Sequence, residues 1–428
     1  MRFANGFLMG AATAAHQVEG NNVHSDCWAM ENMENSTYAE PSLDAVDHYN
    51  RYEEDIALMA KAGLNAYRFS IEWARIEPQE DVFDETEIEH YRDVIRCCKK
   101  NRIEPIVTLH HFSSPKWLIG KGGWEADTTP VDFAKYVRFV MEKLGSEIQY
   151  VCTINEANMG VQVAAIAKRY MIQMMAKMKT APTGGTVQVG MDLEKLMASR
   201  QAAAAAQNME VFGVEKVESF TSPRTEHGDL IIMEAHKAAR EVIRQNSPHV
   251  KVGLTLSLHD IQPVPGGEDN AAKEWEDEFT HYLPFIADDD FLGVQNYTRS
   301  LVDADGSLPV PPDAELTQMD YEFYPEALAN VLRAVAKDYK GELIVTENGI
   351  AVADDTRRVE FIRRALDGVQ NCISDGIPVK GYCYWSLLDN FEWQKGYSMT
   401  FGLIAVDRKT QTRYPKESLA YLGSFCGR

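Results

Sequence analysis

The stretch that decides the fold is LIVTENG at residues 343–349, where a short apolar run ends in a carboxylate and a glycine-containing turn. The apolar residues predict a buried strand, so Glu347 lies at a strand end, a position that suits a nucleophile held by a rigid scaffold. The stretch YVCTINE at residues 150–156 repeats this arrangement with Glu156. Two such carboxylates suggest an acid and nucleophile pair, although each could be an ordinary strand-end residue that pairs with an arginine.

Around these two stretches, short apolar runs alternate with helical patterns along the whole chain. Helices are predicted from Ser42 to Gly63 and from Thr129 to Gly145. The eight predicted strands are 7–12, 64–71, 103–109, 150–154, 252–258, 291–295, 342–346 and 379–385. Eight strands with helical crossovers predict an α/β fold, a closed (β/α)8 TIM barrel, rather than an open doubly wound sheet. We expect a single domain over residues 1–428, with an enlarged connection after the fourth strand.

Charge and composition exclude several classes of partner. A formal net charge of −21 disfavours nucleic acid and anionic membranes, because both repel an acidic surface. No apolar run approaches the roughly 18 residues that would span a bilayer. The N-terminus has no apolar segment followed by a small-residue cleavage site. The seven cysteines show no metal-ligand spacing, so we expect reduced thiols and a cytoplasmic location. No spacing implies a metal or an organic cofactor, and no glycine-rich phosphate fingerprint follows a predicted strand.

Chemically able side chains gather at the C-terminal ends of the predicted strands, the face where catalytic groups of such barrels collect. They are Arg68, His110, His111, Asn155, Glu156, Asn296, Tyr297, Glu347 and Trp385, with Glu392 and Trp393 on the last loop. Each has a structural alternative, such as an ion-pair partner for Arg68, a core histidine for His111 and plain packing for Trp385. Because so many such side chains are predicted at one face of the barrel, a common functional site is favoured over separate structural roles.

The chain resembles family 1 of the glycoside hydrolases, the β-glucosidase family of retaining enzymes. The motifs that carry the resemblance are GAATAAHQVEG (10–20), NAYRFSIEW (65–73), TLHHF (108–112), TINE (153–156), DFLGVQNY (290–297), VTENG (345–349) and YWSLLDNFEW (384–393). They follow one another in order over nearly the whole chain, and the last two are highly specific.

The resemblance implies a role for each site residue. Glu347 is expected to be the nucleophile and Glu156 the general acid and later the general base. Arg68 and Tyr297 would keep Glu347 ionised, while Asn155 would bond the sugar 2-hydroxyl. The expected substrate-binding residues are Gln17, His111, Asn296, Trp385, Glu392, Trp393 and Phe401. Independently of the family, two carboxyls in a dry cleft cannot both ionise cheaply, and Arg68 assigns the low pKa to Glu347.

Several positions depart from the family pattern. Ala157 stands where proline is usual, Asn158 and His16 where an aromatic residue is usual, Phe112 where tryptophan is usual, and Thr400 where arginine is frequent. No catalytic group is lost.

The stretch 157–235 is much longer than the usual connection after the acid/base residue. Helical character is predicted over 161–178 and 193–207, with a break at 183–186. The segment could be a surface helical hairpin packed against the barrel. Alternatively it is a lid whose methionines offer an apolar wall to the leaving group. The stretch 260–290 is shorter than usual.

The expected activity is that of a retaining exo-β-glycosidase on small-molecule β-glycosides. β-D-Glucosides are favoured, with β-galactosides or β-fucosides as side activities. Glu392 and the stretch 396–401, which lacks a phosphate clamp, favour unphosphorylated sugars. The alternatives are a transglycosylase that uses the same glycosyl-enzyme and, more remotely, a non-catalytic sugar-binding barrel.

Overall fold

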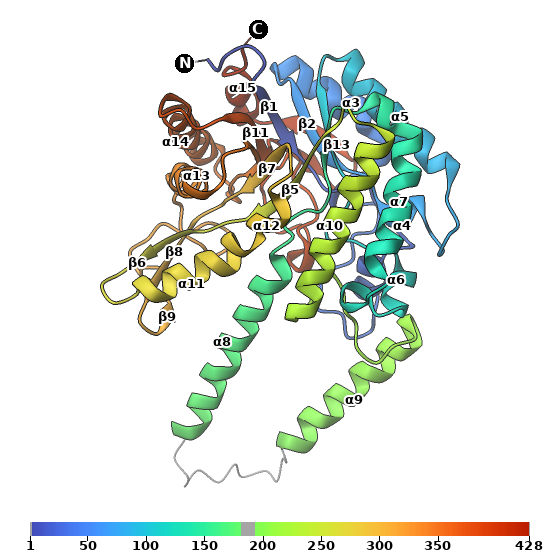
Figure 1. Cartoon of the computed structure of the whole chain (residues 1–428), viewed down its shortest axis with the longest axis vertical. Coiled ribbons are helices and arrows are strands. Elements are labelled where there is room, and N and C mark those ends of the chain that lie inside the picture. Colours follow the sequence, from blue (N-terminus) through green and yellow to red (C-terminus); the bar gives the residue numbers. More distant parts are fainter. Residues whose placement is uncertain (1, 181–192, 428) are drawn as a thin grey trace.

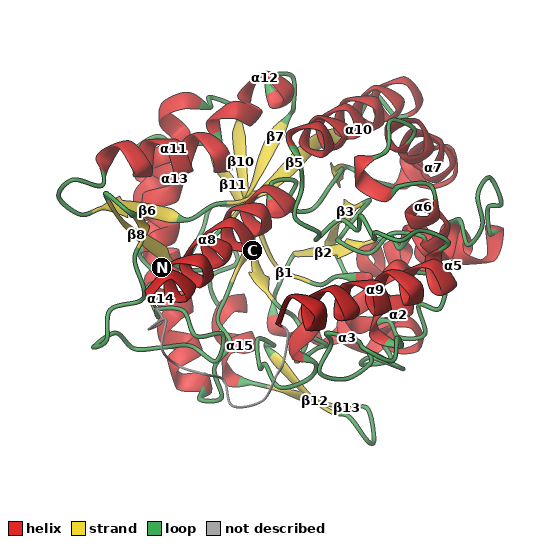
Figure 2. Cartoon of the chain, turned by 90° about the horizontal axis from the view of Figure 1, so that it is seen from below, coloured by secondary structure: helices red, strands yellow, loops and turns green. Residues whose placement is uncertain are grey.

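A parallel barrel of eight strands forms the centre of the computed structural model, which describes residues 2–180 and 193–427. The barrel strands are β1 (Leu8–Ala12), β2 (Ala66–Ser70), β3 (Glu104–Thr108), β4 (Tyr150–Cys152), β5 (Lys251–Ser257), β7 (Phe291–Gln295), β10 (Glu342–Asn348) and β11 (Val379–Trp385). They pair in chain order, and β11 closes the barrel against β1, where Ala12 pairs with Trp385. Each predicted strand overlaps one of these, so the predicted barrel is confirmed (Figure 2).

Helices surround the barrel, as Figure 2 shows. They are α1 (Ala15–Val18), α2 (Asp26–Glu31), α3 (His48–Ala62), α4 (Trp73–Ile76), α5 (Glu85–Lys100), α6 (Lys116–Gly120), α7 (Thr129–Leu144), α10 (Glu226–Asn246), α11 (Glu268–Glu278), α12 (Leu283–Ile286), α13 (Ala327–Asp338), α14 (Asp355–Ser374) and α15 (Glu417–Gly423). The long ones bury one apolar stripe each. In α7 this stripe includes Phe133, Val137, Val140 and Leu144, the face that the sequence predicts.

The predicted start of the first long helix is wrong. The sequence pattern places it near Ser42, whereas α3 begins at His48. Leu43, Ala45 and Asp47 all have positive φ angles, between 46° and 53°, and a chain in this left-handed conformation cannot continue as a right-handed helix. The predicted end is correct, because Gly63 caps the helix with a φ of 99°.

The enlarged connection after β4 contains two long helices, α8 (Met159–Thr180) and α9 (Leu193–Phe212). Figure 1 shows both extending away from the barrel. Arg169 of α8 donates to Glu274 of α11 and to Ser307 of β9. These contacts tie the first half of α8 to neighbouring elements. The predicted break at 183–186 lies outside the described residues.

Two small sheets complete the fold. One contains β6 (Asp260–Pro263), β8 (Arg299–Asp303) and β9 (Gly306–Ser307), and the other pairs β12 (Ile404–Asp407) with β13 (Thr412–Pro415). Across residues 2–180 and 193–427, no helix has the length and apolar character needed to cross a membrane. None of the seven cysteines, all of which lie in the described part of the chain, forms a disulfide.

Candidate active site

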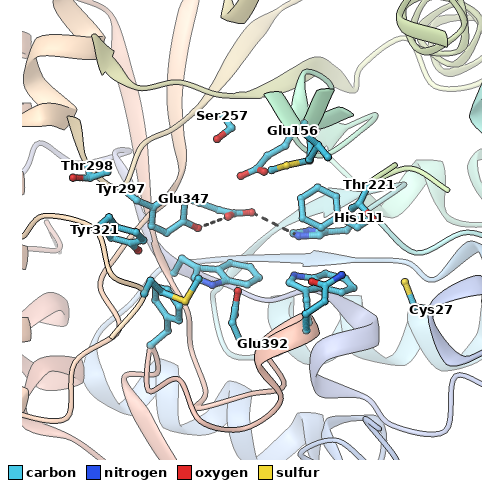
Figure 3. Close-up of a pocket in the computed structure, with 18 of the residues that line it drawn as sticks. Cys27, His111, Glu156, Thr221, Ser257, Tyr297, Thr298, Tyr321, Glu347 and Glu392 are labelled. Atoms are coloured by element: carbon cyan, nitrogen blue, oxygen red, sulfur yellow. Dashed lines mark hydrogen bonds and ion pairs between the residues drawn. The ribbon is translucent and has the colours of Figure 1, made fainter. Parts of the chain in front are cut away.

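The two predicted carboxylates meet at the C-terminal end of the barrel. Glu347 is the second-last residue of β10, and Glu156 follows β4 by four residues. Both line one cavity of about 470 Å³, and Figure 3 shows their side chains pointing into it. Parallel strands deliver their C-terminal residues to one face of the barrel, which explains how residues 191 positions apart in sequence share a cavity.

Three side chains donate hydrogen bonds to the Glu347 carboxylate. Arg68, on β2, donates from Nη1 to Oε1 at 2.6 Å, and the Tyr297 hydroxyl donates to Oε2 at 2.5 Å. Gln295, the last residue of β7, donates to Oε1 at 3.1 Å. Burial raises the pKa of Glu347 above its ordinary value, and Arg68 and Tyr297 oppose that rise. The low pKa that the sequence predicts for Glu347 is therefore wrong. Arg68 is in place beside the carboxyl, but Glu347 is only 3% exposed, and its desolvation outweighs the effect of the cation.

Glu156 lies in a more negative electrostatic setting than Glu347. Burial raises its pKa well above the ordinary value, and the negative charges of Glu347 and Glu392 add to that effect, while Arg68 lowers it. Its backbone has a φ of 43°, and its N–H donates to Thr255 Oγ1 at 2.9 Å. A strained backbone held by a buried hydrogen bond fixes the direction of the side chain. Of Glu156 and Glu347, Glu156 therefore has the pKa that is raised further, which suits a proton donor.

Asn155 connects Arg68, Gln295 and His111 beneath the cavity. Its Oδ1 accepts from Arg68 Nη2 at 2.5 Å and from Gln295 Nε2 at 2.7 Å, and its Nδ2 lies 3.1 Å from His111 Nε2. Burial and the neighbouring Arg68 cation hold the pKa of His111 well below its usual range, so the ring is neutral. A neutral His111 can exchange hydrogen bonds with a sugar hydroxyl without adding charge beside Glu347.

Aromatic rings form the opposite part of the cavity lining, which includes Phe112, Trp385, Trp393 and Phe401. The Trp385 ring stacks against His111 at a centroid distance of 5.6 Å. Trp385 can approach the end of β10 only because residue 349 is glycine, since a Cβ there would lie 1.9 Å from the Trp385 carbonyl oxygen. An apolar ring face beside polar groups suits a sugar, which presents C–H faces and hydroxyls together.

Glu392 adds a third carboxyl to the cavity. Its Oε2 accepts from Gln17 Nε2 at 3.2 Å, and the same Gln17 nitrogen donates to the Phe391 carbonyl at 2.7 Å. Burial and then the charge of Glu347 raise the pKa of Glu392 to about 8. Next to Gln17, the ring of His16 stacks on Trp393 at 5.7 Å, and its Nε2 lies 3.3 Å from Glu31. Helix α1 thus holds the loop that carries Glu392 and Trp393.

The structure brings most predicted residues together, but in two groups. Glu156, Glu347, Tyr297, His111, Trp385, Glu392, Trp393 and Phe401 line the cavity. Arg68, Asn155 and Gln17 are fully buried behind it and reach it through their hydrogen bonds. Asn296 points elsewhere, since its Nδ2 donates to the backbone carbonyls of Leu258 and Thr298 at 2.8 and 2.9 Å.

Sequence reasoning missed Gln295, which contacts both Glu347 and Asn155. Gln295 is the last residue of the predicted strand 291–295. This position could have indicated a site residue, because other site residues were predicted from the ends of strands. Sequence reasoning also missed cavity residues from separate parts of the chain, namely Cys27, Tyr38, Thr221, Ser257, His259, Met319, Tyr321 and Gln394. Ser257 is the last residue of β5, so the strand-end rule could have marked it, whereas those in loops follow no sequence period.

Known proteins resemble the chain over almost its full length. The sequence model of glycosyl hydrolase family 1 matches residues 1–181 and 302–428. A 1,4-beta-D-glucan glucohydrolase of Thermotoga neapolitana is 30% identical, with 97% of this chain and 96% of the relative covered. A 6-phospho-beta-galactosidase of Lacticaseibacillus casei is 29% identical, with coverage of 98% and 96%. The crystal structure of beta-glycosidase BGL167 matches with a TM-score of 0.86 at 43% identity, covering 99% of this chain and 96% of that one.

Proposed function

Because the chain belongs to glycosyl hydrolase family 1 and is an O-glycosyl hydrolase, we propose that it releases terminal glucose from unphosphorylated β-D-glucosides with retention of anomeric configuration. β-Galactosides and β-fucosides would be side activities. One observation carries the proposal: Glu156 and Glu347 share a cavity, and Arg68 and Tyr297 stabilise the charge of Glu347 alone by hydrogen bonds.

In the first step, the Glu347 carboxylate attacks the anomeric carbon while the bond to the leaving oxygen breaks. Glu156 gives its proton to that oxygen, so the leaving group departs as a neutral alcohol. Arg68 and Tyr297 orient the attacking carboxylate from behind. The ring of Trp385 provides the apolar surface on which the sugar rests, and Glu392 accepts hydrogen bonds from its hydroxyls.

In the second step, water takes the place of the leaving group. Once Glu347 is an ester its negative charge is gone, and one of the causes that raise the Glu156 pKa disappears with it. Glu156 can then remain a carboxylate, remove a proton from the water and direct the oxygen to the anomeric carbon. The second displacement restores the original configuration and frees Glu347.

The charge of the cavity favours an uncharged sugar over a phosphorylated one. Its described lining contains three carboxyl side chains and neither lysine nor arginine, whereas phosphate is recognised by such cations. Glu392 next to the sugar offers a phosphate no positive charge, and its ionised form would repel one. This argument separates the chain from the 6-phospho-beta-galactosidase that it resembles. The named relatives are hydrolases, which supports water rather than an alcohol as the second reactant.

We extend the proposal to the setting of the enzyme. Residues 1–428 would form one catalytic domain, with residues 157–235 as an enlarged connection within it. A cytoplasmic location is supported by seven cysteines that form no disulfide in the described structure, because oxidising compartments favour disulfides.

A panel of aryl β-glycosides that differ only in the sugar tests the proposal. The glucoside should be cleaved with the highest kcat/KM, and NMR of the first-formed product should show β-glucose. First-formed α-glucose, or preference for a 6-phosphorylated sugar, would overturn it. Retention further requires the Glu156 and Glu347 carboxyls to lie about 5–5.5 Å apart, which a crystal structure with a covalent fluorosugar would measure.

A further inference from the structure

The Trp393 side chain, which lines the catalytic cavity, contacts two histidine rings. The His16 ring, on α1, stacks on it at a centroid distance of 5.7 Å, with only 4° between the two planes. The His111 ring, which also lines the cavity, stacks on it at 6.3 Å with 21° between the planes. His16 itself does not line the cavity and is 1% exposed. It can therefore affect a bound sugar only through its neighbours.

Two features of Trp393 show that its orientation must be imposed by surrounding groups. Its backbone has a φ of 42°, a conformation that is costly for a bulky residue and persists only where neighbouring contacts hold it. Its indole N–H forms no hydrogen bond with any group in residues 2–180 and 193–427, although the ring borders the cavity. Because indole is a donor only, this N–H is available to a hydroxyl of a ligand.

Both ring nitrogens of His16 are fixed by buried hydrogen bonds. Asn22 Nδ2 lies 3.1 Å from His16 Nδ1 and donates to Ser113 Oγ at 3.3 Å. An amide nitrogen can only donate, so Nδ1 accepts and the ring proton lies on Nε2. Nε2 then donates to Glu31 Oε2 at 3.3 Å, and Glu31 Oε1 accepts from Ser42 Oγ at 2.5 Å. All five side chains are buried.

This chain of hydrogen bonds fixes the plane of the His16 ring. A ring held at both nitrogens cannot tilt or turn over without leaving a buried donor or acceptor unpaired, which is costly. Trp393 lies almost parallel to that ring, so the plane of His16 sets the plane of Trp393. Phenylalanine at position 16 could still pack against Trp393, but nothing would fix its tilt.

We propose that His16 is a positioning residue for sugar binding: its hydrogen-bonded ring sets the tilt of Trp393, whose indole N–H then donates to a hydroxyl of the bound sugar. The proposal rests on the proposed function, since it requires a sugar in the catalytic cavity. Because His16 contacts neither Glu156 nor Glu347, its effect falls on the binding of the sugar rather than on the two displacement steps.

His16→Phe, which keeps an aromatic ring and removes both nitrogens, is the principal test. The readouts are KM and kcat for 4-nitrophenyl β-D-glucoside. KM should rise about fivefold, since a hydrogen bond between uncharged groups is worth roughly that factor, while kcat is unchanged. His90→Phe is the matched control, because His90 also stacks on an aromatic ring, that of Tyr49, but does not line the catalytic cavity. It should leave KM at the wild-type value.

Glu31→Gln provides a second, milder variant if His16→Phe does not fold. Glutamine keeps an acceptor for His16 Nε2 but removes the charge, and hydrogen bonds to charged acceptors are about twice as strong as neutral ones. The ring should therefore be held less firmly, and KM should rise about twofold, again with kcat unchanged.

A double-mutant cycle separates positioning from a general structural role. In a Trp393→Phe background, where the indole N–H is absent, His16→Phe and Glu31→Gln should cause no further change in KM. Unchanged KM in both single variants would overturn the proposal. It would also be overturned by the same KM increase in the Trp393→Phe background, by an equal loss in His90→Phe, or by a loss in kcat rather than in KM. Failure of the wild type to cleave the aryl glucoside at all would instead overturn the proposed function.

Discussion

Tyr297→Phe isolates one hydrogen bond to the proposed nucleophile. The Tyr297 hydroxyl donates to Glu347 Oε2 at 2.5 Å and lowers the pKa of that carboxyl against the effect of burial. Phenylalanine retains the ring, which packs edge-on against Phe401 at 6.2 Å, and removes only the donor. The change therefore acts on the charge of Glu347 with little effect on packing.

The size and sign of the effect follow from the contact. A hydrogen bond to a charged group contributes roughly 1.5–3 kcal/mol. One pKa unit corresponds to about 1.4 kcal/mol, so losing this donor should raise the Glu347 pKa by about 1–2 units. Glu347 must be ionised to attack. The acid limb of the kcat/KM profile should therefore move by the same amount toward higher pH, and activity should be lost first at low pH.

The measurement is kcat/KM against pH for an aryl β-glucoside. Tyr321→Phe is a matched control, because Tyr321 lines the same cavity and its buried hydroxyl has no hydrogen-bond partner among the described residues. The control should leave the acid limb in place. If both variants shift the limb equally, or if Tyr297→Phe leaves it unchanged, Tyr297 does not hold Glu347 ionised and the electrostatic assignment is wrong.

Three further predictions concern the carboxyl groups. A 2-fluoro-2-deoxy-glucoside with a good leaving group should label the peptide that contains Glu347, as mass spectrometry would show, and a label elsewhere would refute its role as nucleophile. Glu156→Ala should cut activity on poor leaving groups by about 10²–10⁴-fold, the usual contribution of a general acid. Added azide should restore turnover and give β-glucosyl azide. Equal loss on good and poor leaving groups, without rescue, would assign the acid/base role to another residue. Glu392→Gln removes a negative charge that raises the Glu156 pKa, so the alkaline limb should move to lower pH, and a shift to higher pH would contradict the coupling.

The apolar runs were sufficient to predict the barrel and the face that carries the chemistry. Strands 291–295 and 379–385 match β7 and β11 to the residue, because buried parallel strands read as continuous apolar runs with sharp ends. The start of α3 could not be predicted in this way. Its apolar stripe extends back toward Ser42, but the left-handed residues at 43, 45 and 47 keep the helix from beginning before His48.

At the site, sequence position placed Glu347 at the end of a strand and Glu156 just beyond one, while Arg68 lies in the middle of β2. It did not distinguish Gln295 from Asn296. Successive side chains at the end of a strand point to opposite sides, and a register change between β7 and β10 next to Glu347 decides which one faces the carboxylate.

The sequence by itself determined that two glutamates follow apolar strands, because strand ends are local features and a parallel barrel gathers them at one face. The sequence also predicted that Glu347 has the lower pKa of the two glutamates, whereas only the tertiary structure decided that burial raises the pKa of both, since desolvation depends on how separate strands and loops enclose the side chains.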